Sequence, residues 1–153
     1  MPQATYLYAV PQYVQPVSMV YQDTHTKAIG YVLWLIGFTG AHRFYYGKPI
    51  TGMLWFFTFG LLGIGWIVDA FLIPQMDDQA NHRFAPGPID YSLVWVMLIF
   101  LGAFGLHRFL QEKYVTGVIY LLTFGLFGFG LVYDILTLNY QIDSTHRRLL
   151  RIK

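Results

Sequence analysis

Gly37-Phe-Thr-Gly-Ala-His-Arg-Phe44 has a near copy later in the chain, because residues 102–109 read Gly-Ala-Phe-Gly-Leu-His-Arg-Phe. The match extends outward from this stretch. Residues 29–74 and 94–139 align without a gap and share 16 identical positions of 46. Self-similarity at a fixed spacing, here 65 residues, indicates a repeated structural unit. The chain is therefore predicted to contain two copies of one unit.

The composition is typical of a membrane protein. Of the 153 residues, 56% are hydrophobic and 12% are charged, whereas roughly one quarter of the residues in soluble domains are charged. The mean hydropathy is +0.45. Lys and Arg are scattered at segment ends, so a nucleic acid partner is not expected. The absence of cysteine excludes disulfides and thiolate metal sites, and no Lys or Arg precedes Lys27, so a cleaved signal peptide is not expected.

The composition and the repeat divide the chain into five segments. Residues 1–26 are rich in Tyr, Gln and Pro and are expected to form a flexible or extended tail, or an aromatic arm on the membrane or on a partner. The first repeat covers 27–74, a polar linker covers 75–91, and the second repeat covers 92–139. The basic tail, 140–153, is expected to lie on the anionic cytoplasmic surface of the membrane.

Each repeat is predicted to be a hairpin of two helices. In the first helix, residues 28–46, the uncharged part is about 21 Å long, shorter than a hydrocarbon core of about 30 Å. His42 and Arg43 are therefore expected near the membrane interface. A turn at Gly47-Lys-Pro49 leads into a 25-residue apolar helix, 50–74, which is long enough to cross. Glycines in the long helices either pack neighbouring helices or kink the chain. These glycines are Gly52, Gly60, Gly63, Gly65, Gly117, Gly125, Gly128 and Gly130.

The predicted fold is an all-α integral membrane protein of four spans. Two tandem transmembrane helical hairpins are related by a pseudo-two-fold axis along the membrane normal. Both His-Arg turns then lie on one face, and Asp69 and Asp134 are expected roughly 30 Å away, so an ion pair between them and the turns is not expected. Six Lys and Arg residues on the side of the termini and linker, against four in the turns, place the termini in the cytoplasm.

The pattern resembles the TM-two domain family, the two-transmembrane-helix or NINE-type membrane proteins of bacteria and eukaryotes. The resemblance is carried by Gly-x-x-Gly-x-His-Arg-Phe-Tyr-Tyr-Gly-Lys, which ends at Lys48, by Gly63-Ile-Gly-Trp66 and by Asp69. The second repeat keeps His-Arg-Phe, the glycines and Asp134 but has Glu112 where the first has a glycine. The resemblance implies paired hairpins with tight turns, a bacterial plasma membrane, and neither a reaction nor a cofactor.

Two interpretations of the basic turns remain open. A guanidinium at headgroup depth binds a phosphate bidentately, and a nearby amine and imidazole would complete a lipid or anion site. Alternatively, these cations anchor the turn and bond the last carbonyls of the helix. Anchoring is favoured because interfacial Arg is common for physical reasons alone. The candidate lipid-binding residues are His42, Arg43, Lys48, His107, Arg108 and Lys113.

Asp69 and Asp134 lie in otherwise apolar segments, which makes them candidates for function. A structural role, with Lys27, Asn81 or His82 satisfying the carboxylate, is favoured over ion or proton handling. A protease is the least favoured, since neither Asp has the Gly-x-Gly-Asp pattern of intramembrane aspartyl enzymes. The histidines lack metal-ligand spacing and the serines lie outside the predicted spans, so neither a metal site nor a catalytic residue is expected.

The predicted function is that of a small non-enzymatic membrane protein. It is expected to act as an interaction protein, scaffold or accessory subunit that packs with itself or with a membrane partner, and to contact membrane lipids. The alternative is a small ion or proton transporter or channel that uses Asp69 and Asp134. The spans contain little polar beyond Thr39, Thr58 and Thr123, which favours packing over a water-filled path.

Overall fold

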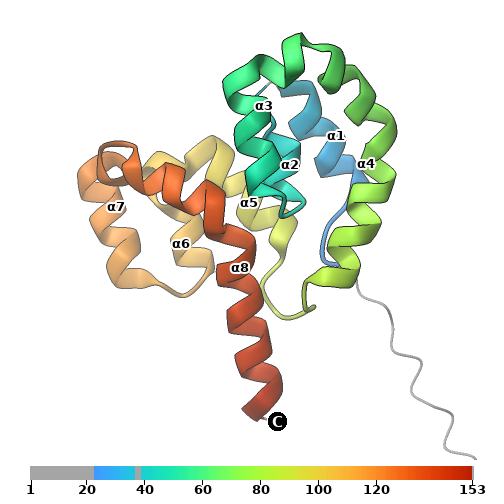
Figure 1. The fold of residues 1–153 in the computed structure, drawn as a ribbon. Helices are drawn as coiled ribbons and strands as arrows, with labels where there is room; N and C mark the ends of the chain where they lie inside the picture. Colours follow the sequence, from blue (N-terminus) through green and yellow to red (C-terminus); the bar gives the residue numbers. More distant parts are fainter. Residues whose placement is uncertain (1–22, 37–38, 153) are drawn as a thin grey trace, which may run out of the picture.

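The computed structural model describes residues 23–36 and 39–152, and every regular element within these ranges is helical. Figure 1 shows two units packed side by side, the first in blue to green and the second in yellow to red. The first unit contains α1 (Lys27–Ile36), α2 (Ala41–Tyr45), α3 (Pro49–Leu62) and α4 (Ile64–Arg83). The second contains α5 (Tyr91–Leu101), the 3-10 helix η1 (Gly102–Phe104), α6 (Leu106–Leu110), α7 (Tyr114–Phe127) and α8 (Phe129–Ile152).

The short helix predicted over residues 28–46 is interrupted. The helix α1 ends at Ile36, and Gly40, with φ 70°, precedes the five-residue α2. A Cβ atom on Gly40 would lie 2.8 Å from Cβ of Trp55, so both the backbone angle and the space require glycine here. Gly105, with φ 72°, occupies the same place before α6. The second glycine of the repeated motif therefore turns the chain so that His-Arg starts a new helix.

The long apolar segment of each repeat is also broken, so the kink that the sequence left open for its glycines occurs, and 50–74 is not one continuous helix. Residues 59–62 all have positive φ, and Gly63, with φ 84°, separates α3 from α4. The side chain of Thr58 accepts a hydrogen bond from the amide of Leu61 across the break. In the second repeat, α7 and α8 bend by 117° at Gly128. The glycines at the break thus reverse the chain.

Because of this break, both ends of the α3–α4 segment lie together (Figure 1). The Nζ atom of Lys48 donates to Gln79 over 2.7 Å, and Arg83 donates to the carbonyl of Gly47 over 3.2 Å. In the second unit, Lys113 donates to Gln141. The turn and the linker therefore lie at the same end of each unit. The prediction that they lie on opposite faces, on which the count of basic residues depended, is wrong for this structure.

Four of the eight predicted packing glycines do approach aromatic rings. Cβ atoms on Gly52 and Gly117 would lie 2.7 Å and 2.9 Å from the rings of Phe44 and Phe109. Corresponding atoms on Gly65 and Gly130 would meet Trp55 and Tyr120. By contrast, nothing lies within 4 Å of a Cβ atom on Gly63 or Gly128, which serve the turn. Gly60 and Gly125 have positive φ and belong to the same break.

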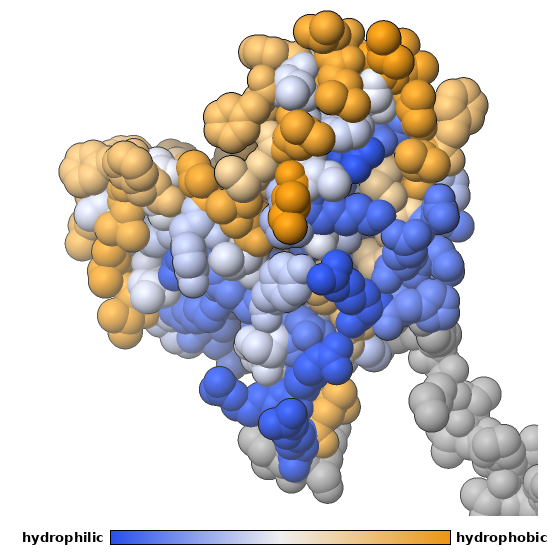
Figure 2. Space-filling view, viewed as in Figure 1, coloured by the Kyte–Doolittle hydropathy of each residue, from blue (hydrophilic) through white to orange (hydrophobic). Residues whose placement is uncertain are grey.

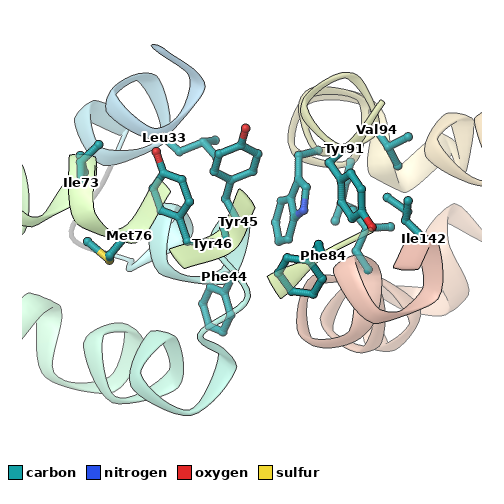
Figure 3. Close-up of a cluster of buried hydrophobic side chains, with 14 residues drawn as sticks. Leu33, Phe44, Tyr45, Tyr46, Ile73, Met76, Phe84, Tyr91, Val94 and Ile142 are labelled. Carbon is teal, nitrogen blue, oxygen red and sulfur yellow. The ribbon is translucent and has the colours of Figure 1, made fainter. Parts of the chain in front are cut away.

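One core joins the two units. Figure 3 shows Phe44, Tyr45 and Tyr46 of the first unit facing Phe84 and Tyr91 of the connecting segment and the second unit. Polar contacts reinforce this core, because the buried side chain of Asn139 donates to the carbonyls of residues 44 and 45 and accepts from the indole of residue 95. The repeats are therefore parts of one packed body.

The predicted linker and the basic tail are largely helical. The helix α4 continues through the first nine residues of the predicted linker to Arg83, and α8 includes the basic tail to Ile152. Asp143 and His146 of α8 bond the backbone of Ala85, which fixes the connection. Most of the predicted N-terminal tail, residues 1–22, lies outside the described residues, as do positions 37 and 38 of the repeated motif. Its last part is packed, since His25 is fully buried.

Much of the apolar surface lies at the two helix breaks, and exposed side chains such as Ile50, Phe71 and Val115 extend it along the adjoining helices. Figure 2 shows hydrophobic residues over both upper lobes and hydrophilic residues over the lower part of this face. Leu62 and Phe127, at the breaks, are 88% and 86% exposed. None of the described helices is by itself both long and apolar enough to cross a bilayer. The bent pair Tyr114–Phe127 and Phe129–Arg151 meets that criterion of length and composition when taken together.

Candidate functional site

The structure brings His42, Arg43 and Asp69 together at the interior of the first unit. The Nε atom of Arg43 donates to Oδ2 of Asp69 over 2.7 Å, and a second guanidinium nitrogen donates to Oδ1. Nε2 of His42 lies 2.7 Å from Oδ2 of Asp69. The expectation that these residues cannot pair is therefore wrong. The break at residues 59–62 folds α4 back against α2, which removes the separation that a straight helix would impose.

Burial and an aromatic ring complete this first cluster. His42 and Asp69 are fully buried, and Arg43 is only 9% exposed. The guanidinium carbon of Arg43 lies 3.6 Å from the ring centroid of Trp55, a cation–π contact. A buried carboxylate is costly unless it is paired and hydrogen-bonded. Asp69 meets both conditions through its two neighbours from α2, and not through Lys27, Asn81 or His82 as predicted.

The second unit repeats the arrangement with different support. Asp134 accepts from Arg108 over 3.0 Å and 2.7 Å and lies 2.7 Å from Nε2 of His107. Tyr120 replaces the tryptophan, and its hydroxyl accepts from Arg108 over 2.8 Å. Gln141 also donates to Asp134. The charges are therefore paired in the same way, but Arg108 has a partner besides the carboxylate.

The six predicted lipid-binding residues are divided by the structure into two groups. His42, Arg43, His107 and Arg108 face the carboxylates inside the units. Lys48 and Lys113 lie outside these clusters and donate to glutamine side chains. A phosphate site built on the His-Arg pairs would compete with the carboxylates for the same guanidinium nitrogens. Lipid binding stays a prediction, with a changed set of residues.

His25 is a core residue that no feature of the sequence indicates. Its ring packs edge-on against Tyr45, with ring centroids 4.8 Å apart, and lies 4.9 Å from the ring of Tyr91. Nδ1 lies 2.9 Å from the hydroxyl of Thr24. Asn81 holds this segment in place by accepting from the amides of Thr24 and His25. No local pattern marks such a residue, because its partners lie about 20 to 66 positions away.

His25 and Asp77 are expected to give the stability opposing dependences on pH. Burial lowers the pKa of His25 from 6.5 to about 4, so the unfolded chain binds a proton that the folded chain lacks, and stability falls by at most about 3 kcal/mol as the pH falls through this window. Burial raises the pKa of Asp77 from 3.8 to about 6. The folded chain then takes up the proton first, which adds stability as the pH falls from about 6.

The two contributions can be separated by comparing denaturation midpoints at pH 7 and pH 4.5. Asp77→Asn is expected to lose more stability on acidification than the unchanged protein does. His25→Phe is expected to lose less, or to gain. Parallel pH profiles for all three proteins would show that neither group titrates in this range.

The geometry of the clusters is that of an internal brace. Each carboxylate receives hydrogen bonds from an Arg and lies against a His, and the three side chains join the start of α2 or α6 to the arm that returns from the break. Nδ1 of both His42 and His107 is buried and has no hydrogen-bond partner among the described residues. Nε1 of Trp55, whose ring completes the first cluster, is likewise buried without a hydrogen-bond partner among the described residues.

Comparison with known proteins agrees with two copies of one unit. The family model for the TM2 domain matches residues 23–71 and again residues 88–136. The chain belongs to the TM2 domain family. This result confirms the resemblance that the sequence motifs carry. Each TM2 domain contains one complete cluster, with Asp69 in the first range and Asp134 in the second.

Several relatives contain TM2 domains. A TM2 domain-containing protein of Dictyostelium discoideum is 44% identical over 57 residues, which is 37% of each chain. A second one from the same organism is 43% identical over 69 residues, 40% of this chain and 50% of the relative. TM2 domain-containing protein 1 of Mus musculus is 37% identical over 62 residues, 40% of this chain and 30% of the relative. The chain thus covers half or less of these relatives. No solved structure matches it significantly.

Proposed function

We propose that this TM2 domain protein is a non-enzymatic integral membrane protein that serves as a scaffold or accessory subunit, packing with itself or with a membrane partner. One observation carries the proposal: the polar groups of the repeated motif bond one another inside each unit, while large apolar side chains cover the outside of both breaks. A surface of this kind favours contact with lipid and with other apolar surfaces. The motif stabilises the unit that presents the surface.

The same distribution of polar and apolar side chains supports an orientation of the protein in the membrane. We place the apolar breaks, with Leu62 and Phe127, in the hydrocarbon, and the cationic ends, with Lys48 and Arg83, at the headgroups. Lys and Arg side chains can bury their apolar stems while their charged ends reach the headgroups, which supports this placement. A bacterial plasma membrane and cytoplasmic termini stay predictions from the sequence, whereas four complete spans do not fit this placement, because both ends of each broken segment lie together.

Site-specific photo-crosslinking in native membranes tests the interaction role. A photoreactive residue at Phe127, which is 86% exposed, is expected to give a protein adduct, either with a second copy or with a partner of defined mass. The matched control places the same residue at Asp78, whose side chain is 73% exposed on the polar part of the first unit, and is expected to give no such adduct. Adducts with lipid alone at Phe127 would contradict the proposal.

Proton handling is the second candidate, and a specific observation favours it. The unpartnered Nδ1 atoms of His42 and His107 are buried next to carboxylates, a chemistry suited to passing protons. Against it, the large cavity between the units has an almost entirely apolar lining. The purified protein in liposomes is expected to show no more proton flux than empty liposomes. Flux above that level would support the second candidate.

A further inference from the structure

A groove between the two units is open to the surrounding medium. It is a cavity of about 430 Å³, which falls within the range of small-molecule sites. One wall comes from α2 and α3 of the first unit, and the other from α5 and α8 of the second. Figure 2 shows a notch between the two apolar lobes. Met53 and Phe56 line the first wall, and Val132 and Leu136 line the second.

The groove is suited to a hydrocarbon chain. Among the described residues of its lining, Thr39 has the one polar side chain that is not aromatic, and the others are apolar or aromatic. Phe56 and Val132 at its rim are more than half exposed, so the groove opens outward. Within a membrane the acyl chain does not leave water, so the walls contribute van der Waals packing with the chain, whereas a polar ligand would lose hydrogen bonds there. The shape and chemistry of the walls therefore fit an acyl chain better than a polar ligand.

A cationic cavity continues the groove along the same two helices. It has a volume of about 320 Å³ and is lined by Lys48, Arg83 and Tyr140 among others. On α3, the lining passes from Ile50 in the cationic cavity to Met53 in the apolar groove, three residues away and on the same side of the helix. On α8, it passes from Tyr140 to Leu136, one helical turn away, on the same side of the helix. One end of the groove is thus apolar and the other is basic.

The two cations at this end have no carboxylate partner within the described part of the chain. Lys48 donates to the neutral side chain of Gln79. Arg83 donates to the carbonyl of Gly47 and to the hydroxyl of Tyr140. Their positive charge is therefore not compensated locally, and a guanidinium beside an ammonium is a favourable site for a phosphate group.

We propose that this groove binds one anionic phospholipid, with the headgroup phosphate at Lys48 and Arg83 and an acyl chain between α3 and α8. The second unit does not repeat the site, because Glu112 stands beside Lys113 and that ammonium is held by Gln111 and Gln141. Within residues 23–36 and 39–152 we therefore propose one such site. The inference depends on the membrane location of the protein and is independent of the scaffold role.

Native mass spectrometry of the full-length, delipidated protein in detergent tests the site. Phosphatidylglycerol is expected to bind with a stoichiometry of one, and phosphatidylcholine with the same acyl chains is expected to bind more weakly. Inorganic phosphate is expected not to compete. Lys48→Gln combined with Arg83→Gln is expected to weaken phosphatidylglycerol binding by about thirtyfold, since two contacts between basic residues and an anionic headgroup are lost.

A second pair of variants tests the apolar part without changing any charge. Val132→Trp places a large ring in the groove and is expected to abolish the single bound lipid. The matched control, Val118→Trp on α7, lies outside the groove and at similar exposure, and is expected to leave binding unchanged. Equal binding of the two lipids, unchanged binding in the double Gln variant, or unchanged binding in Val132→Trp would each overturn the proposal.

Discussion

Replacing Asp69 by Asn is expected to lower the free energy of unfolding by about 3 to 5 kcal/mol, the range measured when one member of a buried ion pair is removed. Arg43 is left with a full charge in the interior, where its hydrogen bonds to side chains go to Asp69 and its face lies on Trp55. Asn cannot accept two parallel hydrogen bonds from the guanidinium while carrying a balancing charge. The cost therefore comes mainly from the unpaired cation.

The measurement is denaturation in detergent micelles, followed by tryptophan fluorescence. Asp78→Asn on the same helix is the matched control, because that carboxyl is 73% exposed and its pair with His82 lies at the surface. It is expected to change stability by less than about 1 kcal/mol. Asp134→Asn is expected to cost less than Asp69→Asn, since Arg108 keeps the hydroxyl of Tyr120. A loss no larger than that of the control would contradict the brace.

The helical architecture and the repeat could be predicted from the sequence, because both depend on local signals. Apolar composition and the recurrence of Gly-x-x-Gly-x-His-Arg-Phe are visible without any knowledge of tertiary contacts. The residues of the brace were also identified, as His42, Arg43 and Asp69 were all singled out. Their pairing does not follow from the sequence, because a continuous helix over 50–74 would place Asp69 roughly 30 Å from the His-Arg turn.

The sequence does contain a signal for the break. Thr-Phe-Gly-Leu recurs as residues 58–61 and 123–126, where the Thr hydroxyl accepts from the amide three residues later. Phe59 and Leu61 have positive φ, which is uncommon for residues other than glycine and costs roughly 1–2 kcal/mol per residue. The residue types in this stretch therefore do not predict the break. The equal spacing of 27 residues between His and Asp in both copies is a second signal.

The long-range contacts had no comparable signal. Asn139 aligns with Pro74 in the first repeat, so the duplication gives no indication that its side chain joins the two units. Tyr120 and Gln141 similarly depart from their counterparts, Trp55 and Met76, and make the two clusters unequal. Symmetry between the copies thus predicts the shared brace, whereas each feature that depends on the interface between the copies requires the structure.

Asn139→Leu is expected to weaken the contact between the two units and to lower the free energy of unfolding by about 3 kcal/mol. Leu fills a similar volume, so the loss reflects hydrogen bonds. The amide nitrogen of Asn139 donates to the carbonyl of Tyr45 over 2.6 Å, and its oxygen accepts from the indole of Trp95. Trp95 is fully buried and would keep an unpaired N–H group, which costs roughly 1–3 kcal/mol. We also expect the unfolding transition to broaden, because the two units would unfold less cooperatively.

A double-mutant cycle distinguishes this explanation from a general loss of packing. Ser144→Ala on the exposed side of α8 is the control and is expected to change stability by no more than about 0.5 kcal/mol. Trp95→Phe removes the indole donor, so the double variant of Trp95→Phe with Asn139→Leu no longer buries an unpaired N–H group. Its loss is expected to be smaller than the sum of the two single losses, by roughly 1 kcal/mol or more. Additive losses would show that the unpaired indole of Trp95 does not contribute to the loss in Asn139→Leu, which would then come from the bonds of Asn139 to the carbonyls of residues 44 and 45.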